Sequence, residues 1–564
     1  MAEQATTEQW SSRLGAVLAV AGSAIGLGNF LRFPGLAAQY GGGAFMIAYF
    51  CAFLLLGIPL SWVEWSIGRR GGVLGAHSCA GIFERLTRSR RWRYVGVFAL
   101  LTPLSICMYY MYLQSWTLGY AYHTAMGHLE LAHAADYEQF FADYVGAAAD
   151  GSAWDVASTG ILIFFALAFA FNLFLIYRGV SRGIERFCKI SMPVLLVTSL
   201  VILVRVLTLG TPDPAHPERS INSGLGYMWN PDKVVLQVNT EGDTWKTQRM
   251  LPPNADPQQE EATRAALQAE FPGRPIRRQH ITLAQGLMNP DLWFAAISQI
   301  FYSLSVGFGI VCTYASYARR RQDIALSSLS ANAANECVEV GIAGMMIVPA
   351  AVSFLGVAAA AGASTFGLGF NVLPQVFAVM PGGRIIGTLF FLLLSLAAVN
   401  GCISLIQNSL AFVEESWGLR RRHSVALIGF LLGGGSLIVA TFSGGGLLGL
   451  STLDFWCGQL CVFLVATCYL IIFRFYWGVP KGLRELRLGA DFPIPRFLGF
   501  IISWISPSIL LAVFVAWLCK NTLFSMSPEV RALVQLEPGA VSSLAWVAFT
   551  ALVFLIMART SRHA

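Results

Sequence analysis

Apolar runs of about 20 residues, long enough to cross the hydrocarbon core of a bilayer, recur along almost the whole chain. Of the 564 residues, 55% are hydrophobic and 12% are charged, whereas soluble domains carry about 25% charged residues. Backbone groups find no water inside a bilayer, so such runs must form helices that pack together. The sequence therefore predicts an all-α membrane protein with about twelve spanning helices. The runs lie near residues 14–38, 43–68, 94–123, 158–177, 189–209, 290–317, 337–361, 384–413, 424–441, 447–473, 498–519 and 540–558.

The first run is interrupted by residues that a helix surrounded by lipid does not tolerate. Between residues 21 and 34 it contains Gly22, Gly26, Gly28, Asn29 and Arg32. Unwound carbonyls at such a break can coordinate a small cation, and the free amides of the next half-helix can hold a carboxylate. The spacing of Gly22 and Gly26 also suits close helix packing. A buried arginine costs about 2.5 to 3.5 kcal/mol even on lenient scales, so Asn29 and Arg32 favour a binding site.

A second break has the same place in the second half of the chain. The sixth run is interrupted between Ser303 and Gly309, and the first and sixth runs each begin a group of five. For this run alone, a local bend without a ligand is the alternative. Paired interruptions at equivalent positions are typical of inverted-repeat transporters with a site near the middle of the membrane. The expected parts are a first five-helix repeat (10–209), an extracellular loop with an insertion (210–288), a second, inverted repeat (289–474), and helices 11 and 12 with the C-terminus (475–564).

Basic residues predict the orientation of the chain in the membrane. They cluster after the second, fourth, sixth and eighth runs, at 69–93, 178–189, 319–321 and 420–422. Since cytoplasmic loops are enriched in lysine and arginine, both termini are expected in the cytoplasm, with the protein in the inner or plasma membrane. The net charge of +7 then follows from topology and does not indicate a nucleic-acid partner.

Two long loops, 124–157 and 210–288, are expected on the outer side. None of the 11 cysteines lies in either loop, so no extracellular disulfide is expected. In the second loop, an amphipathic helix is expected at 258–271. The remainder is rich in proline, glutamine and charges and is interpreted as solvated loop, including the basic stretch 274–280.

Several motifs occur in a fixed order along the chain. They are Trp10-x-x-Arg13-Leu-Gly15, Gly26-Leu-Gly28-Asn29-Phe-x-Arg32-Phe-Pro34, Gly41-Gly-Gly-Ala-Phe45, Pro59-Leu-x-Trp-x-Glu64-x-x-x-Gly68-Arg69, Tyr109-Tyr110, Gly307-Phe-Gly309, Asn335-Glu336 and Asp454-Phe-Trp456. Together they closely resemble the neurotransmitter:sodium symporter family, in particular the bacterial leucine transporter, across residues 10–558. The resemblance implies the leucine-transporter fold, a five-plus-five inverted repeat with helices 1 and 6 broken. Residues 232–285 are an extra segment.

The resemblance implies a first sodium site made of the Ala24 carbonyl and the Asn29, Ser303 and Asn335 side chains. The substrate carboxylate would complete the shell. These are hard oxygen ligands, and the two asparagines supply oxygen without charge. The alternative is that Asn29 and Asn335 are hydrogen-bonded polar core residues.

A second sodium site would use the carbonyls of Gly22, Ile25 and Ala397 and the side chain of Asn400. Asn400 stands where the family usually has threonine or aspartate, and Gly401 where it usually has serine. One hydroxyl ligand is therefore lost, and the number of sodium ions stays open between one and two. No organic cofactor is expected.

For the substrate, the resemblance places an amino-acid carboxylate on the amides of Leu27 and Gly28 and on the Tyr110 hydroxyl. Gly26 stands where monoamine carriers of the family have an aspartate, so a substrate with its own carboxylate is expected. The pocket walls favour an uncharged, apolar side chain, with Gly401 enlarging one wall. The other substrate-binding residues would be Ser23, Ala24, Ile106, Tyr302, Ser303, Ser305, Phe308 and Leu405.

Two gates are implied in the same way. Arg32 and Asp454 match an outer gate that closes by a direct or water-mediated ion pair, with Tyr302 as a lid. Trp10, Tyr317 and Glu415 match an inner gate. The arginine that the family has just before the tryptophan is replaced by Thr7, so inner closure must use other contacts.

Glu339 stands where chloride-dependent members of the family have a serine, four residues after Asn335. An ionised carboxylate there would supply the negative charge that chloride otherwise brings, so transport without chloride is expected. The alternative is that Glu339 is a protonated, hydrogen-bonded core residue.

The expected function is a sodium-coupled symporter that imports a neutral, apolar amino acid by alternating access. The alternative is a membrane receptor or sensor that binds the amino acid without transporting it. A membrane enzyme is less favoured, because the intramembrane carboxylates Glu64 and Glu339 have no metal-ligand cluster or nucleophile elbow with them. The expected partners are the amino acid and the lipid bilayer, and a homodimer stays open.

Overall fold

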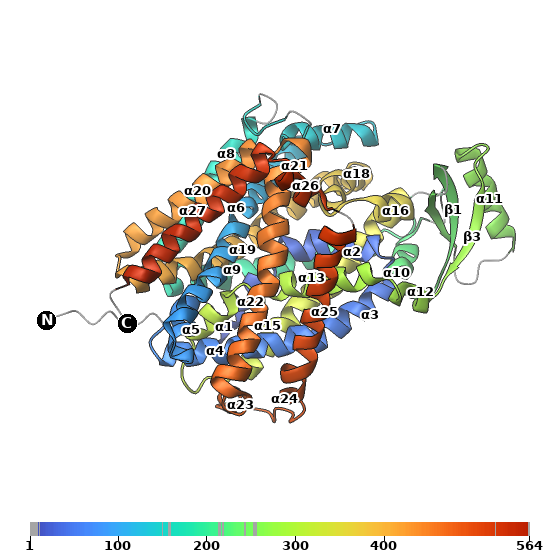
Figure 1. Ribbon diagram of the computed structural model, residues 1–564. Coiled ribbons are helices and arrows are strands. Elements are labelled where there is room, and N and C mark those ends of the chain that lie inside the picture. Colours follow the sequence, from blue (N-terminus) through green and yellow to red (C-terminus); the bar gives the residue numbers. More distant parts are fainter. Residues whose placement is uncertain are drawn as a thin grey trace.

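The structure is a bundle of membrane-spanning helices with a small sheet at one end (Figure 1). It is a computed structural model and describes residues 10, 12–148, 151–155, 159–212, 216, 219–241, 244–251, 257–524 and 526–561. Over these residues, ten helices are long and apolar enough to cross a membrane, and the pair Leu14–Ala24 and Gly28–Gln39, bent by 47°, makes an eleventh span. α13 (Pro290–Leu304) and α14 (Ile310–Ser316) flank a second break at the place of the predicted sixth span. The predicted architecture is confirmed.

The first five spans combine α-helices with short π-helical turns, labelled η. Span 1 is α1 (Arg13–Ala24), η1 (Gly28–Arg32) and α2 (Phe33–Gln39); span 2 is α3 (Gly43–Ala52), η2 (Phe53–Gly57) and α4 (Ile58–Val73); span 3 is α6 (Arg90–Met126); span 4 is α8 (Thr159–Tyr177); span 5 is η4 (Val180–Glu185) and α9 (Arg186–Leu207). The connecting helices are α5 (Cys79–Thr87), α7 (Ala134–Tyr144) and α10 (Ile221–Trp229).

The remaining spans are built in the same way. After span 6 (α13 and α14), span 7 is α15 (Ile324–Glu336), η5 (Cys337–Gly344) and α16 (Met345–Gly362); span 8 is α19 (Gly383–Trp417); span 9 is α20 (Arg421–Thr441); span 10 is α21 (Gly444–Leu453), η7 (Asp454–Cys461), α22 (Val462–Ile471) and η8 (Ile472–Gly478), followed by α23 (Val479–Arg487). Span 11 is α24 (Leu498–Phe500), η9 (Ile501–Ile505), α25 (Ser506–Leu518) and η10 (Cys519–Phe524), and span 12 is α27 (Pro538–Thr560). The connecting helices are α12 (Leu283–Leu287), α17 (Thr365–Gly367), η6 (Leu368–Val372), α18 (Leu373–Val379) and α26 (Pro528–Val534).

Both breaks contain residues that leave the helical backbone conformation. Ile25, which follows α1, has φ −79° and ψ 88°. In the second break, Ser305, Gly307 and Gly309 have φ of 53°, 82° and 74°. Glycine adopts positive φ without steric cost, which explains two of these three positions. The Ser305 hydroxyl donates to the Ser23 carbonyl at 3.0 Å, so the two breaks lie against each other.

α6 and α19 form the middle of the bundle and contact each other. In their most apolar windows, 78% and 83% of the residues are buried, compared with 22% in the helix Leu498–Asn521 and 33% in Pro538–Thr560. Spans 11 and 12 therefore lie at the rim of the bundle, where lipid would surround them.

An α/β subdomain extends from the bundle at the right of Figure 1. The strands β1 (Lys233–Glu241), β2 (Thr244–Leu251) and β3 (Ile276–Ile281) pair antiparallel in the order β2-β1-β3. The helix α11 (Pro257–Glu270) covers one face of the sheet. A separate small core holds them together, made of Leu236, Val238, Leu251, Leu267 and Ile276.

This subdomain corrects part of the prediction for the second long loop. The expected helix at 258–271 is confirmed as α11. The expectation that the rest is solvated loop was wrong, and the fold is all-α only outside this segment. Val234, Leu236 and Val238 alternate along β1 and pack in the small core with α11, while Val235 and Gln237 on the opposite face are buried as well. The sequence did not predict this strand because its apolar run is short and is surrounded by charged residues and prolines.

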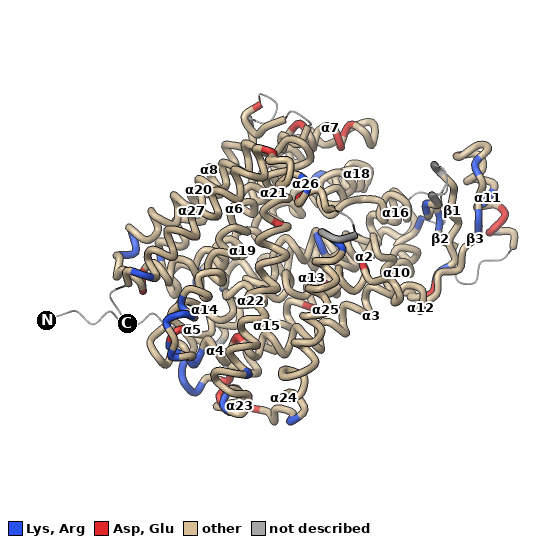
Figure 2. Tube along the Cα trace, viewed as in Figure 1, with Lys and Arg blue, Asp and Glu red and all other residues tan. Residues whose placement is uncertain are grey.

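Lysines and arginines gather around α5, α14 and α23, at the end of the bundle where both termini lie (Figure 2). Within this cluster Arg69, at the end of α4, is fully buried and pairs with Glu485 of α23 at 2.8 Å. A second basic group covers the outer subdomain, mainly on β3. The basic loops that predicted the orientation therefore do share one face of the bundle.

Lys233 ties the outer subdomain to the bundle, and its replacement should loosen that subdomain. Its ammonium donates to the carbonyls of Gly41, between α2 and α3, and of Tyr227 in α10, whose ring centre lies 4.1 Å away. Lys233→Met leaves both carbonyls unpaired, at roughly 1 to 3 kcal/mol for each buried group. We expect chymotrypsin to cut within 233–281 several times faster. Lys246→Met, on an exposed lysine of β2, is the control, and equal cleavage of both variants would contradict this role.

Candidate functional site

A cavity of about 280 Å³ lies where spans 1, 3, 6, 8 and 10 meet. It begins at the two helix breaks and reaches Thr365 and Glu529. These residues belong to connections on the face opposite the termini. Nearly all of the predicted substrate-binding residues line it, namely Ser23, Ala24, Gly26, Leu27, Gly28, Ile106, Tyr110, Tyr302, Ser305, Phe308, Gly401 and Leu405. Ser303 lies instead in the polar cluster described below.

The break of span 1 places small residues and amides around one hydroxyl. The Tyr110 hydroxyl accepts a hydrogen bond from the Leu27 amide at 2.8 Å. A Cβ on Gly26 would stand 2.7 Å from this hydroxyl, whereas a Cβ on Gly28 would meet nothing within 4 Å. A Cβ on Gly401 would lie 3.0 Å from the Tyr110 ring, so this ring fills the space that was expected to enlarge the pocket.

Apolar side chains form the wall beside these amides. Ile106 from α6, Phe308 from the second break and Leu405 from α19 line the cavity at this depth and are buried. The Phe308 ring packs against Tyr302, with ring centres 5.7 Å apart. The charged lining residues of the described chain are Arg32, Asp454 and Glu529.

Asn29, Ser303, Asn335 and Glu339 form one buried polar cluster between spans 1, 6 and 7. The Asn29 amide donates to Asn335 at 2.8 Å and to Glu339 at 3.3 Å, and its own oxygen accepts the Gly26 amide at 2.9 Å. The Asn335 amide donates to Ser303 and, at 3.2 Å, to Glu339. The structure therefore brings together the three side chains predicted for the first sodium site, while Ala24 ends α1 and lines the cavity together with Asn29.

Glu339 is the acceptor at the centre of this cluster. Besides Asn29 and Asn335, it accepts from the Gln299 amide and the Ser303 hydroxyl. An ionised carboxylate only accepts hydrogen bonds, so three amide donors match the charged form. Amide, hydroxyl and carboxylate oxygens are the hard ligands that an alkali cation prefers. The oxygens present thus fit a sodium ion, with the carboxyl group of Glu339 among them.

Gly22 and Asn400 face each other between α1 and α19, at the predicted second sodium site. A Cβ on Gly22 would lie 3.6 Å from the Asn400 side-chain oxygen. The same oxygen accepts the Ser191 hydroxyl of span 5 at 2.9 Å. A hydroxyl therefore stands next to Asn400, although Gly401 brings none. The other predicted members, Ile25 and Ala397, are buried in the same two spans.

Arg32, Tyr302 and Asp454 lie between the breaks and the mouth of the cavity. The Arg32 guanidinium lies 4.3 Å from the centre of the Tyr302 ring, and the Tyr302 hydroxyl donates to Asp454 at 2.6 Å. Tyr109 donates to the same carboxylate at 2.9 Å. Within the described residues Arg32 and Asp454 form no direct ion pair, and Arg32 donates to Gln299 at 2.9 Å instead. The predicted outer-gate residues are together, and Tyr302 connects them.

The end of the cavity toward the termini is closed by aromatic packing. Trp10 is 3% exposed, and its indole donates to the Tyr314 carbonyl at 2.9 Å. The Tyr317 ring packs edge-on against Trp10 at 6.2 Å and is stacked on His77 at 4.8 Å. Two of the predicted inner-gate residues are thus in contact with each other.

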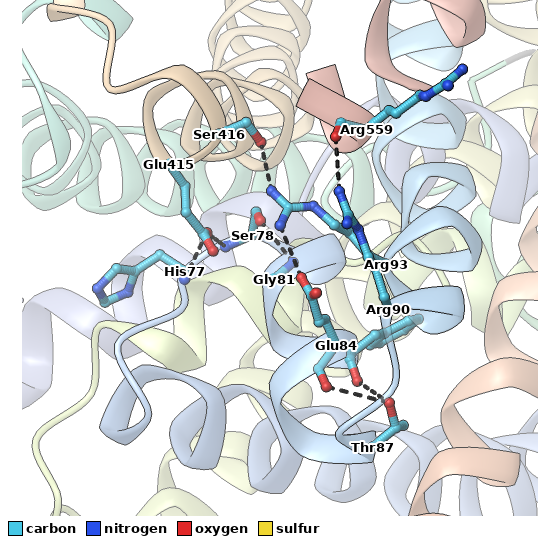
Figure 3. Close-up of polar contacts among 11 residues, drawn as sticks. His77, Ser78, Gly81, Glu84, Thr87, Arg90, Arg93, Glu415, Ser416 and Arg559 are labelled. Atoms are coloured by element: carbon cyan, nitrogen blue, oxygen red, sulfur yellow. Dashed lines mark hydrogen bonds and ion pairs between the residues drawn. The ribbon is translucent and has the colours of Figure 1, made fainter. Parts of the chain in front are cut away.

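Glu415, the third predicted inner-gate residue, binds the start of α5 (Figure 3). It accepts the backbone amides of His77 and Ser78 at 3.3 and 3.0 Å. Amides at a helix N-terminus carry partial positive charge, so they suit a carboxylate. Arg93 fastens the same region by donating to Glu84 and Ser416. Thr7 lies outside the described residues.

Comparison with known proteins decides the family. The sequence profile of the sodium:neurotransmitter symporter family matches residues 7–207 and 279–559, which is more than half of the chain. The chain belongs to this family. The unmatched stretch between the two segments contains the β1, β2 and α11 elements of the outer subdomain.

Individual members of the family are similar to it over most of its length. An uncharacterized sodium-dependent transporter of Methanocaldococcus jannaschii is 25% identical over 516 residues, which cover 90% of this chain and 89% of the relative. The sodium-dependent dopamine transporter of Caenorhabditis elegans is 22% identical over 90% of this chain and 79% of its own. The solved structure of MhsT in complex with L-phenylalanine matches with a TM-score of 0.70 and 26% identity, covering 90% of this chain and 99% of that one.

Three polar residues of this symporter site were not anticipated as site residues. Gln299 lies one turn before Ser303 on α13 and therefore on the same face of the helix. This spacing could have predicted Gln299 as a member of the site. Ser191 has no such signal, because only the packing of span 5 against α19 brings it to Asn400. Glu64, which was considered only as an enzyme carboxylate, accepts the Gly307 amide at 2.6 Å and so holds the second break.

Tyr110→Phe should weaken binding of a carboxylate-bearing ligand. The change removes the hydroxyl that contacts the Leu27 amide and faces Gly26, and a hydrogen bond to a charged group contributes about 1.5 to 3 kcal/mol, or roughly ten- to hundredfold in affinity. Scintillation-proximity binding of a labelled apolar amino acid measures this. Tyr120→Phe is the matched control, because Tyr120 is buried on the same helix and its hydroxyl has no hydrogen-bond partner among the described residues. Equal affinities of the two variants would contradict the assigned role.

Proposed function

We propose that the protein is a sodium-coupled symporter that imports a neutral, apolar amino acid by alternating access and does not need chloride. The observation that carries the substrate class is the closeness of the Tyr110 hydroxyl to Gly26 and the Leu27 amide. Residue 26 has no side chain to offer a charge, and the half-helix that begins there offers amides to an anion. A substrate that brings its own carboxylate fits this arrangement, and a simple amine does not.

The side chain of the substrate would lie against Ile106, Phe308 and Leu405. These residues present only carbon atoms at that depth, so a charged side chain there would be left without a partner. The solved relative MhsT was crystallised with L-phenylalanine, which agrees with an apolar amino acid here. The substrate ammonium would face the oxygens of Ser23, Ala24 and Ser305, which line the same cavity.

Sodium coupling is supported by the cluster of Asn29, Ser303, Asn335 and Glu339. Its oxygens lie next to the break at which the substrate carboxylate would sit, so ion and substrate would share one shell of ligands. One sodium ion moving down about 100 mV releases about 2.3 kcal/mol, and about 1.4 kcal/mol supports each tenfold accumulation. One ion therefore suffices, and a second would be held by Gly22 and Asn400.

Alternating access is supported by the asymmetry of the two ends of the cavity. The cavity extends to Thr365 and Glu529 on the face of the long loops, while Trp10 and Tyr317 close it on the face of the termini. We infer that the face with the termini is cytoplasmic, since it carries the basic loops, and that the protein lies in the inner or plasma membrane. In this orientation the conformation described here receives its substrate from outside.

Uptake into proteoliposomes tests the proposal. With an inward sodium gradient, labelled leucine or phenylalanine should accumulate above its external concentration, and the ratio of labelled sodium to substrate gives the stoichiometry. Asn335→Ala should abolish accumulation, because it removes an oxygen ligand from a site with little access to water. Asn332→Ala is the control, on the same helix but facing Ser61 of α4. Accumulation without sodium would contradict the coupling, and binding without accumulation would identify a receptor.

Glu339→Ser should make transport depend on chloride. In the wild type the carboxylate balances the sodium charge in a low-dielectric interior, so uptake should be the same in gluconate and in chloride. Replacing it removes that charge and leaves room for an anion, so uptake in gluconate should fall several-fold and recover as chloride is added. Initial uptake rates at increasing chloride measure this. A wild type that needs chloride, or a variant that is indifferent to it, would refute the assignment.

A further inference from the structure

A second cavity, of about 270 Å³, lies between spans 10 and 11, away from the substrate site. Its walls are mostly apolar and come from α22, η8 and α25, with Leu470 and Leu510 buried at its base and Leu464, Thr467 and Leu511 exposed along it. Leu464 and Leu511 are 44% and 64% exposed, and span 11 belongs to the least buried part of the bundle. The cavity is therefore a groove on the surface that faces the hydrocarbon of the bilayer.

One charged side chain stands in this groove. Arg474 lines it and donates to the Ser503 carbonyl, and its guanidinium lies 4.2 Å from the Trp504 ring centre and 5.1 Å from that of Phe475. Within the described residues Arg474 has no carboxylate partner. An arginine beside apolar groove walls is costly unless an anion or water reaches it. The planar guanidinium of an arginine can donate two hydrogen bonds to the oxygens of one phosphate group.

The groove begins at the level of the lipid headgroups. Arg474 precedes α23 by one turn, and α23 buries Gly482, Leu483 and Leu486 while it exposes Lys481 and Arg484. Such a helix lies in the plane of the interface. Around it, Phe475, Tyr476, Phe500 and Trp504 are exposed, as in the aromatic belt of a membrane protein. Headgroup and acyl-chain levels thus meet within this groove.

We propose that the groove binds a glycerophospholipid with an anionic headgroup, from the leaflet on the side of the termini. Its phosphate pairs with Arg474, and one acyl chain lies along Thr467, Leu511 and Phe514. The charge of Arg474 selects the headgroup, since none of the described residues that line the groove is acidic. The apolar walls bind the acyl chain independently of the headgroup.

One residue of the groove packs against the broken span 6. Phe463 lines the groove and packs edge-on against Phe301 of α13 at 5.2 Å. Phe301 directly precedes Tyr302, which connects the outer-gate residues. An acyl chain in the groove therefore supports the packing of span 10 against the broken span 6.

Native mass spectrometry of the full chain tests the proposal. The purified protein is mixed with phosphatidylglycerol and phosphatidylcholine of equal acyl chains, and the retained lipids are counted. The wild type should retain about ten times more phosphatidylglycerol, and Arg474→Gln should lose this preference while still binding both. Thr467→Trp should fill the groove and lose both lipids. Arg496→Gln, on an exposed arginine outside the groove, should behave as the wild type.

Two results would overturn the proposal. One is equal retention of the two lipids by the wild type, and the other is unchanged phosphatidylglycerol retention in Arg474→Gln and Thr467→Trp. Thermal unfolding and size-exclusion profiles confirm that each variant is folded. If Thr467→Trp fails to fold, Leu464→Trp replaces it, because Leu464 is exposed at the rim and a larger side chain there blocks the groove without overpacking the bundle.

Discussion

The arrangement of the substrate site depends on backbone groups that find no hydrogen-bond partner within their own helix. Spans 1 and 6 each lose their helical hydrogen bonds in the middle of the membrane, where no lipid can replace them. The two breaks solve this problem together, since the Ser305 hydroxyl binds the Ser23 carbonyl and Glu64 and Asn29 bind the Gly307 and Gly26 amides. Contacts between spans therefore hold both breaks, and residues of both breaks line the cavity.

Glu339 extends this arrangement toward the mouth of the cavity. It accepts from Asn29, Asn335, Ser303 and Gln299, and Gln299 in turn accepts from Arg32. The guanidinium at the mouth and the carboxyl group in the cluster are thus separated by one amide side chain. A cation in the proposed sodium site would compete with these amides for the carboxylate and would thereby act on the hydrogen bonds that reach Arg32.

The sequence predicted those parts of the structure that depend on length, hydropathy or an interruption. The spans follow from apolar runs, the first break from glycines beside Asn29 and Arg32, and the second break from the interruption between Ser303 and Gly309. Residue types alone did not predict which side chains would meet: Gln299 and Ser191 are single polar residues in apolar spans, and their partners lie in other spans. The outer sheet was missed because its core is made of a few alternating residues within a charged segment.

The attachment of the outer subdomain has a consequence for following the protein in motion. Lys233 joins the start of β1 to the turn between α2 and α3, which directly follows the outer half of the broken first span. A tilt of that half-helix must therefore carry the sheet with it or break this contact. In Figure 1, α11 lies on the side of the sheet away from the bundle. If the subdomain moves with the half-helix as a rigid body, a small rotation at the membrane displaces α11 more than it displaces β1. A fluorophore on α11 would report that rotation without touching the transport path.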